Sequence, residues 1–188
     1  MDYFSKGWDI VKDDFLAWII LFVVYSAIVS FTFGLGGILS INLWRSTKAA
    51  IEGKTAPVVG DLFKFDRIVD DIILLVLIVI AMCVGALVCC IGYVFAAILF
   101  FWAPLLLADG NFSPINAMKA SWGHAKGEMV AVLIFLVLVA VTSTLGALFC
   151  GVGIYLALPV IYAAQWSFFM DHRDEIYRLA EASGLDTI

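Results

Sequence analysis

Three long stretches without a charged residue limit what this chain can fold into. They cover residues 15–44, 72–108 and 129–170, which are 30, 37 and 42 residues long. A helix that crosses a membrane needs roughly 20 apolar residues, so the two longer stretches suit two crossings each. In lipid the backbone must satisfy its own hydrogen bonds, which favours helices. The sequence therefore predicts an all-α, polytopic integral membrane protein.

Glycines near the middle of each stretch predict that it folds back on itself. They are Gly34, Gly36 and Gly37 in the first stretch, Gly85 and Gly92 in the second, and Gly146, Gly151 and Gly153 in the third. Because glycine commonly marks turns, we predict six transmembrane helices arranged as three tandem hairpins. The first stretch is short for two crossings, and a single tilted span is the alternative there.

The charged residues all lie outside these stretches and predict the orientation. The chain has 11 Lys and Arg, 16 Asp and Glu, and a net charge of −5. Basic residues that flank membrane helices stay on the cytoplasmic side, so both termini are expected in the cytoplasm. The acidic balance argues against nucleic acid as a partner. All six tryptophans lie near the charged boundaries, as in an interfacial aromatic belt: Trp8, Trp18, Trp44, Trp102, Trp122 and Trp166.

A spacing of 57 residues relates three parts of the chain. Asp14, Asp71 and Glu128 lie at this spacing and each precedes an apolar run. Residues 53–57, Gly-Lys-Thr-Ala-Pro, match residues 110–114, Gly-Asn-Phe-Ser-Pro, at the same spacing. We predict a single membrane domain over 1–188 with repeat units at about 1–52, 53–109 and 110–171. The alternative is that unrelated helical hairpins share these features.

Each repeat is expected to start with an amphipathic helix at the cytoplasmic interface. Pro57 and Pro114 suit a first helical turn, and Ser113 is a good N-cap. After Pro114, one apolar face is predicted from Ile115, Met118 and Trp122. A shorter face is predicted from Val58, Leu62 and Phe65. A partial face near the N-terminus consists of Tyr3, Gly7, Trp8 and Val11. Alternatively, each segment is the cytosolic end of a transmembrane helix.

The C-terminal residues 171–188 are predicted to form a separate short cytoplasmic helix. Asp171 can cap its start and Gly184 can end it. Its apolar stripe consists of Ile176, Leu179 and Ala180. This stripe is too small to hold the helix alone, so we expect it to rest on the chain's own cytoplasmic face, a second copy or a partner.

Polar residues inside the apolar stretches are few. They include Asn42, Gln165, Thr142, Ser143 and Thr144. Interhelical hydrogen bonding is the expected use, and a small polar cavity is the alternative. Pro104 and Pro159 each remove one helical hydrogen bond and are expected to bend their helices. The stretches contain no ionisable Asp, Glu, Lys, Arg or His, which argues against an ion-coupled transporter.

No catalytic, cofactor-binding or metal site is predicted. His124 and His172 lack metal-ligand spacing to another His or Cys, and residues 171–174 are interpreted as a solvated helix start. No catalytic or phosphate-binding motif is present. The cysteines are expected to be small buried side chains: Cys83, Cys89, Cys90 and Cys150. A disulfide from Cys89 or Cys90 to Cys150 is the alternative in an oxidising compartment.

Motifs along the chain carry a family resemblance. They are residues 101–110, Ser113 with Pro114, residues 117–122, Lys126 with Gly127, and shorter matches at residues 7–15 and 60–63. They resemble a bacterial group of six-helix membrane proteins of largely unknown function, which includes the membrane domain fused to some glycerophosphodiester phosphodiesterases. The resemblance implies the six-helix fold and the bacterial inner, or cytoplasmic, membrane. It implies no established activity.

The function expected first is a non-enzymatic membrane scaffold or accessory subunit that acts through protein–protein contacts. The expected partners are the lipid bilayer and either a second copy of the chain or another membrane protein. A channel or transporter for a small neutral or apolar solute is one alternative, and a lipid-modifying enzyme is another. No cofactor is expected.

Overall fold

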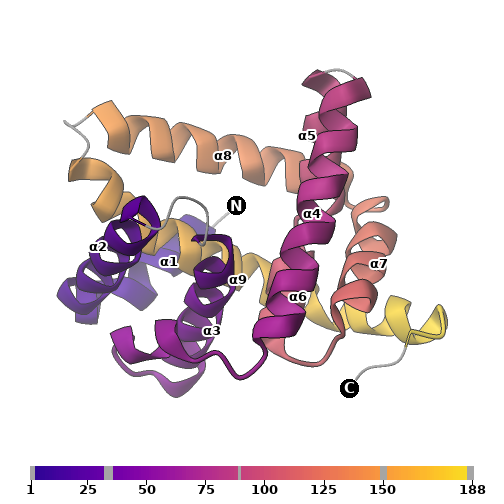
Figure 1. Ribbon diagram of the computed structural model, residues 1–188. Helices are drawn as coiled ribbons and strands as arrows, with labels where there is room; N and C mark the ends of the chain where they lie inside the picture. The colour runs from indigo at the N-terminus through magenta and orange to yellow at the C-terminus, as the bar shows by residue number, and fades with distance from the viewer. Residues whose placement is uncertain (1–2, 32–35, 89, 149–151, 186–188) are drawn as a thin grey trace. The chain divides into compact units, whose positions relative to one another are not determined.

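The computed structural model describes residues 3–31, 36–88, 90–148 and 152–185 (Figure 1). These residues form helices joined by turns and contain no β-strand, so the predicted all-α class is confirmed for them. The chain divides into two compact units, Met1–Phe65 with Phe135–Asp171, and Asp66–Ile134 with His172–Ile188. We call these the first and the second unit. The single-domain organisation and the repeat boundaries stay predictions.

In the described part of the chain, three helices and two 3₁₀ turns lie wholly in the first unit. They are α1 Tyr3–Val11, η1 Lys12–Asp14, α2 Phe15–Phe31, α3 Gly36–Gly53 and η2 Val59–Phe63. Gly7 lets α1 approach α9 (Val152–Ala182), because a Cβ on Gly7 would lie 2.7 Å from the carbonyl oxygen of Val160. The core of the unit consists of Val11, Trp18, Leu21, Phe22, Leu39, Leu43, Ala50, Leu62 and Ala163.

The segment after Pro57 differs from its prediction. It forms only the five-residue turn η2, in which Leu62 is buried, while Val58 and Phe65 are exposed. The amphipathic helix predicted there is wrong, because Gly60 and the β-branched residues beside it disfavour a helix. The amide of Asn42 donates to the carbonyl oxygen of Leu62 at 3.1 Å, which holds the turn against α3.

Four of the helices that the structure describes lie wholly in the second unit. They are α4 Ile68–Val88, α5 Cys90–Leu99, α6 Ala103–Asp109 and α7 Pro114–Ala125. A Cβ on Gly85 in α4 would lie 2.6 Å from the carbonyl oxygen of Gly92 in α5, and the reverse contact is equally restricted. The two backbones therefore touch at glycines. In the first unit, a Cβ on Gly146 in α8 (Met129–Leu148) would likewise lie 3.0 Å from the carbonyl oxygen of Gly153 in α9.

Helix α9 corrects the prediction for the tail. It runs for 31 residues through Pro159 and Asp171 without interruption, so the separate helix predicted to begin at Asp171 is wrong. No residue near Asp171 disfavours a helix, and one N-terminal signal does not end a helix already formed. The predicted end is confirmed, because Gly184 follows the helix with a φ of 68°.

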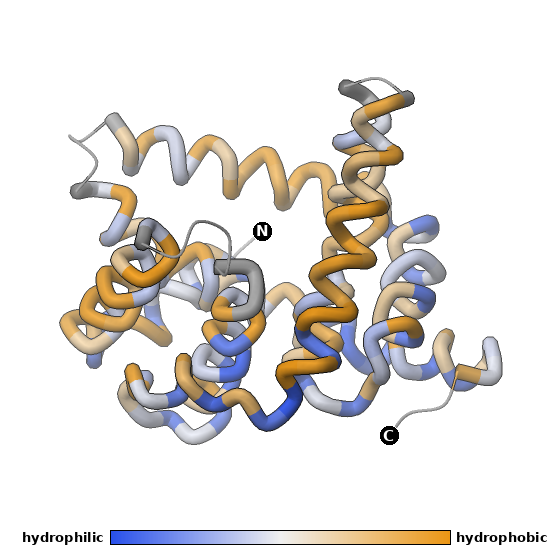
Figure 2. The backbone as a smooth tube through the Cα atoms, in the orientation of Figure 1, coloured by the Kyte–Doolittle hydropathy of each residue, from blue (hydrophilic) through white to orange (hydrophobic). Residues whose placement is uncertain are grey.

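Among the residues that the structure describes, five helical segments are long and apolar enough to cross a membrane. They are Tyr3–Ser30, Ile68–Leu87, Gly92–Asp109, Met129–Ala147 and Gly153–Ala182. Figure 2 shows hydrophobic residues along most of α4 and α8. The chain is therefore a helical membrane protein. Helix α3 is not among the five, since it carries Arg45, Lys48 and Glu52, and the six spans in three hairpins stay a prediction.

The tryptophans and cysteines differ from expectation in part. Trp18, Trp44, Trp102 and Trp166 are buried within the protein, and only Trp8 and Trp122 are exposed. The aromatic-belt interpretation is therefore wrong for the four buried rings, which fill space between helices instead. Cys83 is an exposed free thiol rather than a buried one. The side chains of Cys89, Cys90 and Cys150, and with them the disulfide alternative, lie outside the described residues.

Candidate functional site

The turn between α6 and α7 is the centre of the polar structure in the second unit. Helix α6 ends at Asp109 and is capped by Gly110, whose φ of 95° suits glycine and whose amide donates to the carbonyl oxygens of Leu106 and Leu107. Helix α7 begins at Pro114, and the Ser113 hydroxyl accepts from the amide of Asn116 at 3.4 Å. The predicted N-cap is therefore confirmed. The turn is built so that both helix ends have their backbone groups satisfied.

Asp109, just before this turn, is a buried carboxylate held by α9. Its Oδ2 accepts from the Nε of Arg173 at 2.9 Å and from the hydroxyl of Tyr177 at 2.5 Å. The amide of Asn111 donates to the same hydroxyl at 2.8 Å. We call Asp109, Asn111, Arg173 and Tyr177 the Asp109 cluster. It fixes the C-terminal part of α9 on the α6–α7 turn by charge-assisted hydrogen bonds.

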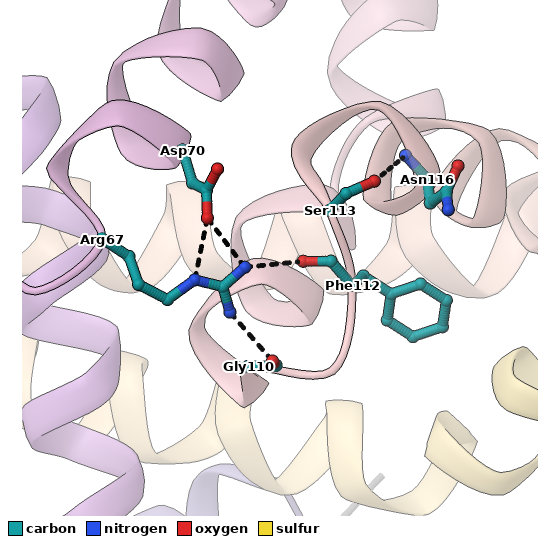
Figure 3. A network of polar contacts seen from close by, with 6 residues as sticks. All are labelled: Arg67, Asp70, Gly110, Phe112, Ser113 and Asn116. Atoms are coloured by element: carbon teal, nitrogen blue, oxygen red, sulfur yellow. Dashed lines mark hydrogen bonds and ion pairs between the residues drawn. The ribbon is translucent and has the colours of Figure 1, made fainter. Parts of the chain in front are cut away.

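Arg67, the residue just before α4, holds the same turn (Figure 3). Its guanidinium forms an ion pair with Asp70 at 2.8 Å. It also donates to the carbonyl oxygen of Gly110 at 2.9 Å and to that of Phe112 at 3.3 Å. Arginine suits this position because its planar fork carries several donors in fixed directions. The turn is thus held by the residue before α4 as well as by α9.

The Ser121 side chain in α7 supplies hydrogen bonds to the backbone at the break between α5 and α6. Pro104 cannot donate to the carbonyl of Phe100, which accepts instead from the amide of Ala103 at 3.2 Å. At the same break, the Ser121 hydroxyl donates to the carbonyl oxygen of Leu99 at 2.7 Å. Its oxygen accepts from the amide of Trp102 at 3.2 Å. The predicted bend at Pro104 is thus a full interruption, stabilised by a side chain from another helix.

Two histidines and a tryptophan lie together beside this break. The ring centroids of Trp102 are 5.6 Å from His124 and 5.4 Å from His172, and the two imidazoles are 5.6 Å apart. Nε2 of His124 is buried without a hydrogen-bond partner among the described residues. Burial lowers the pKa of His124, and the neighbouring His172 lowers it further, against the opposing charges of Glu175 and Glu128. Burial and His172 thus both favour the neutral imidazole of His124.

Most of the polar residues singled out in the sequence contact other parts of the protein itself. Asn42 bonds to another element, as expected. Thr142 and Thr144 donate to carbonyls four residues earlier in their own helix, α8, and their interhelical role stays a prediction. Gln165 is half-buried in α9. Residues 171–174 are not simply a solvated start, because Arg173 binds Asp109 and His172 joins the aromatic group. No group of three or more His, Cys, Asp or Glu in the described ranges is placed to hold a metal ion.

Sequence reasoning missed the Asp109 cluster. Asp109 and Tyr177 are 68 residues apart, and no local spacing connects them. The available signal was a single acidic residue at the end of an apolar run, which alone suggests a solvated helix end. The carboxylate, the guanidinium and the phenol of this cluster bind one another. The cluster therefore holds α6, the turn and α9 in fixed positions.

Comparisons with known proteins add no family to this picture. The chain matches no protein-family model, no curated protein and no solved structure. Its class therefore rests on its own helices, which define a helical membrane protein.

Proposed function

We propose that this protein is a non-enzymatic integral membrane scaffold or accessory subunit that acts through protein–protein contacts. The observation that carries the proposal is that the polar side chains around the α6–α7 turn and the Pro104 break bind other groups of the protein itself. Asp109, Arg173 and Tyr177 bind one another, and Arg67 and Ser121 bind backbone atoms. These groups fix helix ends in place, so the second unit presents a rigid surface to its surroundings.

The outward face of α4 supports the same proposal. The exposed large side chains of this helix are aliphatic along its length: Ile68, Val69, Ile72, Ile73, Val76, Val79, Ile80, Val84 and Leu87. Such a face can be covered only by lipid or by another apolar surface. The close contact at Gly85 and Gly92 shows that this part of the chain favours tight helix packing. We infer that part of the α4 face is covered by a second copy of the chain or by another membrane protein.

The finer topology belongs to the same proposal. It comprises six spans, both termini in the cytoplasm and a place in the bacterial inner membrane. The distribution of Lys and Arg supports the orientation, because all 11 lie outside the three uncharged stretches. The contacts between α2 and α3 support a hairpin within the first stretch.

Two measurements on the purified full chain test the proposal. Native mass spectrometry from mild detergent should show a species heavier than one chain, because a scaffold keeps its partner. Liposomes that contain the protein should show no more glycerol flux than empty liposomes. A strictly monomeric protein that conducts a small neutral solute would contradict the proposal and favour a channel.

A further inference from the structure

A pocket of about 390 Å³ lies between α7 and the end of α9. Lys119 and Gly123 line it from α7, Leu179 and Ser183 from α9, and Leu185 from the residues that follow. All of these residues belong to the second unit, in which Figure 1 shows α7 beside the last turns of α9. The volume lies within the range of about 300–1,000 Å³ that small-molecule sites occupy. The pocket is separate from the Asp109 cluster, none of whose residues lines it.

The lining combines one cation with apolar side chains. Lys119 is exposed and forms no ion pair with another residue that the structure describes. Helix α7 contains no Asp or Glu that could neutralise it. Leu179 and Leu185 supply the apolar wall. This pattern suits an amphiphile that carries a negative charge.

Helix α7 follows a candidate membrane span almost directly in the chain. Only residues 110–113 separate α7 from the candidate span Gly92–Asp109. The outward face of α7 exposes Ile115 and Trp122, and the Lys126 ammonium lies 5.0 Å from the ring centre of Trp122. Exposed apolar and aromatic side chains with lysines are typical of a helix at the membrane surface.

We propose that this pocket binds the head group of an anionic phospholipid. In this arrangement the Lys119 ammonium pairs with the lipid phosphate, and the glycerol backbone contacts Leu179 and Leu185. Basic pockets beside membrane helices bind anionic head groups by the same physics. The inference goes beyond the scaffold proposal and does not depend on it.

Gly123 keeps the pocket open and offers a precise way to close it. A Cβ at this position would meet no atom within 4 Å, so a larger side chain can enter the pocket without a clash. Glycine inside a helix is also unfavourable for the helix itself. Gly123→Leu should therefore fill the pocket while α7 remains folded.

The test titrates the full chain in detergent with phosphatidylglycerol and, separately, with phosphatidylcholine. Native mass spectrometry counts the bound lipid, and circular dichroism checks the fold of each variant. Lys119→Gln should weaken binding of the first phosphatidylglycerol molecule by about fivefold, the effect expected for one lysine at a lipid head group. Gly123→Leu should weaken this binding as well, because the added side chain fills the pocket. Lys126→Gln is the matched control, since it removes the same charge from a lysine just after α7 that does not line the pocket. It should weaken binding by less than about twofold.

Four outcomes would overturn the proposal. Equal affinity for the two lipids would show that the negative charge is not recognised. Wild-type binding by both pocket variants would show that the lipid binds elsewhere. An equal loss in Lys126→Gln would indicate attraction by the whole surface, and full competition by free glycerol phosphate would indicate a site for a soluble anion.

Discussion

The hydroxyl of Tyr177 donates to the carboxylate of Asp109 at 2.5 Å, although 68 residues separate them in the chain. The Asp109 side chain has no exposure to solvent, while that of Arg173, its ion-pair partner, keeps 30% of its own. Through this contact the end of α9 is held on the turn between α6 and α7. The same contact ties the C-terminal part of the chain to a residue at the end of a candidate membrane span.

Loss of the Asp109 carboxylate should destabilise the protein. Asp109→Ala is expected to lower the free energy of unfolding by about 2–4 kcal/mol, because it leaves the charge of Arg173 without its partner. Tyr177→Phe should cost about 1–2 kcal/mol, since Asn111 loses its acceptor. Unfolding in mixed micelles, followed by circular dichroism, measures both. The exposed Arg178→Ala on the same helix should change stability by less than about 0.5 kcal/mol; an equal loss there would contradict this account.

Ser121→Ala should lower the free energy of unfolding although it removes only one oxygen atom. It removes the partner of the Leu99 carbonyl and of the Trp102 amide at a buried helix break, and we expect a loss of about 1–3 kcal/mol. Ser30→Ala is the control, because the exposed Ser30 hydroxyl bonds only to a carbonyl four residues earlier in its own helix. If the two variants unfold at the same denaturant concentration, Ser121 does not stabilise the break.

Glycine-to-alanine changes should have opposite signs at two positions. Gly85→Ala places a Cβ 2.6 Å from the carbonyl oxygen of Gly92 and should cost about 1–3 kcal/mol as α4 and α5 move apart. Gly123→Ala meets no atom within 4 Å and should stabilise α7 by about 0.5–1 kcal/mol. The unfolding midpoints of both variants in one detergent test this. A stabilised Gly85→Ala would show that the two backbones are not in contact.

Acid should destabilise the protein through His124. Its pKa is lowered in the folded state, mainly by burial. Below pH 6.5 the unfolded chain therefore binds the proton more readily than the folded protein does. The contribution of His124 to stability is complete above that pH and falls as the pH drops towards the folded pKa. Melting temperatures between pH 7.5 and about pH 5 should show this decline. His124→Gln should flatten it, and an unchanged slope in that variant would assign the effect to other groups.

The sequence predicted the parts of the fold that local chemistry determines. Long uncharged runs predicted α4 and α8, and Ser113 with Pro114 predicted the start of α7, because these signals act within a few residues. The sequence could not show that Trp102 and Trp166 are buried, since a tryptophan beside a charged boundary is equally typical of a membrane interface.

The candidate site was harder to predict than the helices. Asp109 meets Arg173 and Tyr177 only after the chain has folded, and neither periodicity nor composition records such a pairing. The start predicted at Asp171 was wrong because a capping residue is compatible with the middle of a longer helix. Long-range polar contacts therefore need the structure, whereas the helical membrane class does not.

Contacts of the α4 face in its native membrane test the central proposal most directly. Photoreactive side chains placed in turn at the exposed Val76, Val79 and Ile80 should yield protein adducts heavier than one chain on irradiation. The buried Leu74 is the matched control on the same helix and should yield none. Lipid adducts alone at all three exposed positions, with no heavier protein species, would contradict a scaffold that acts through protein–protein contacts.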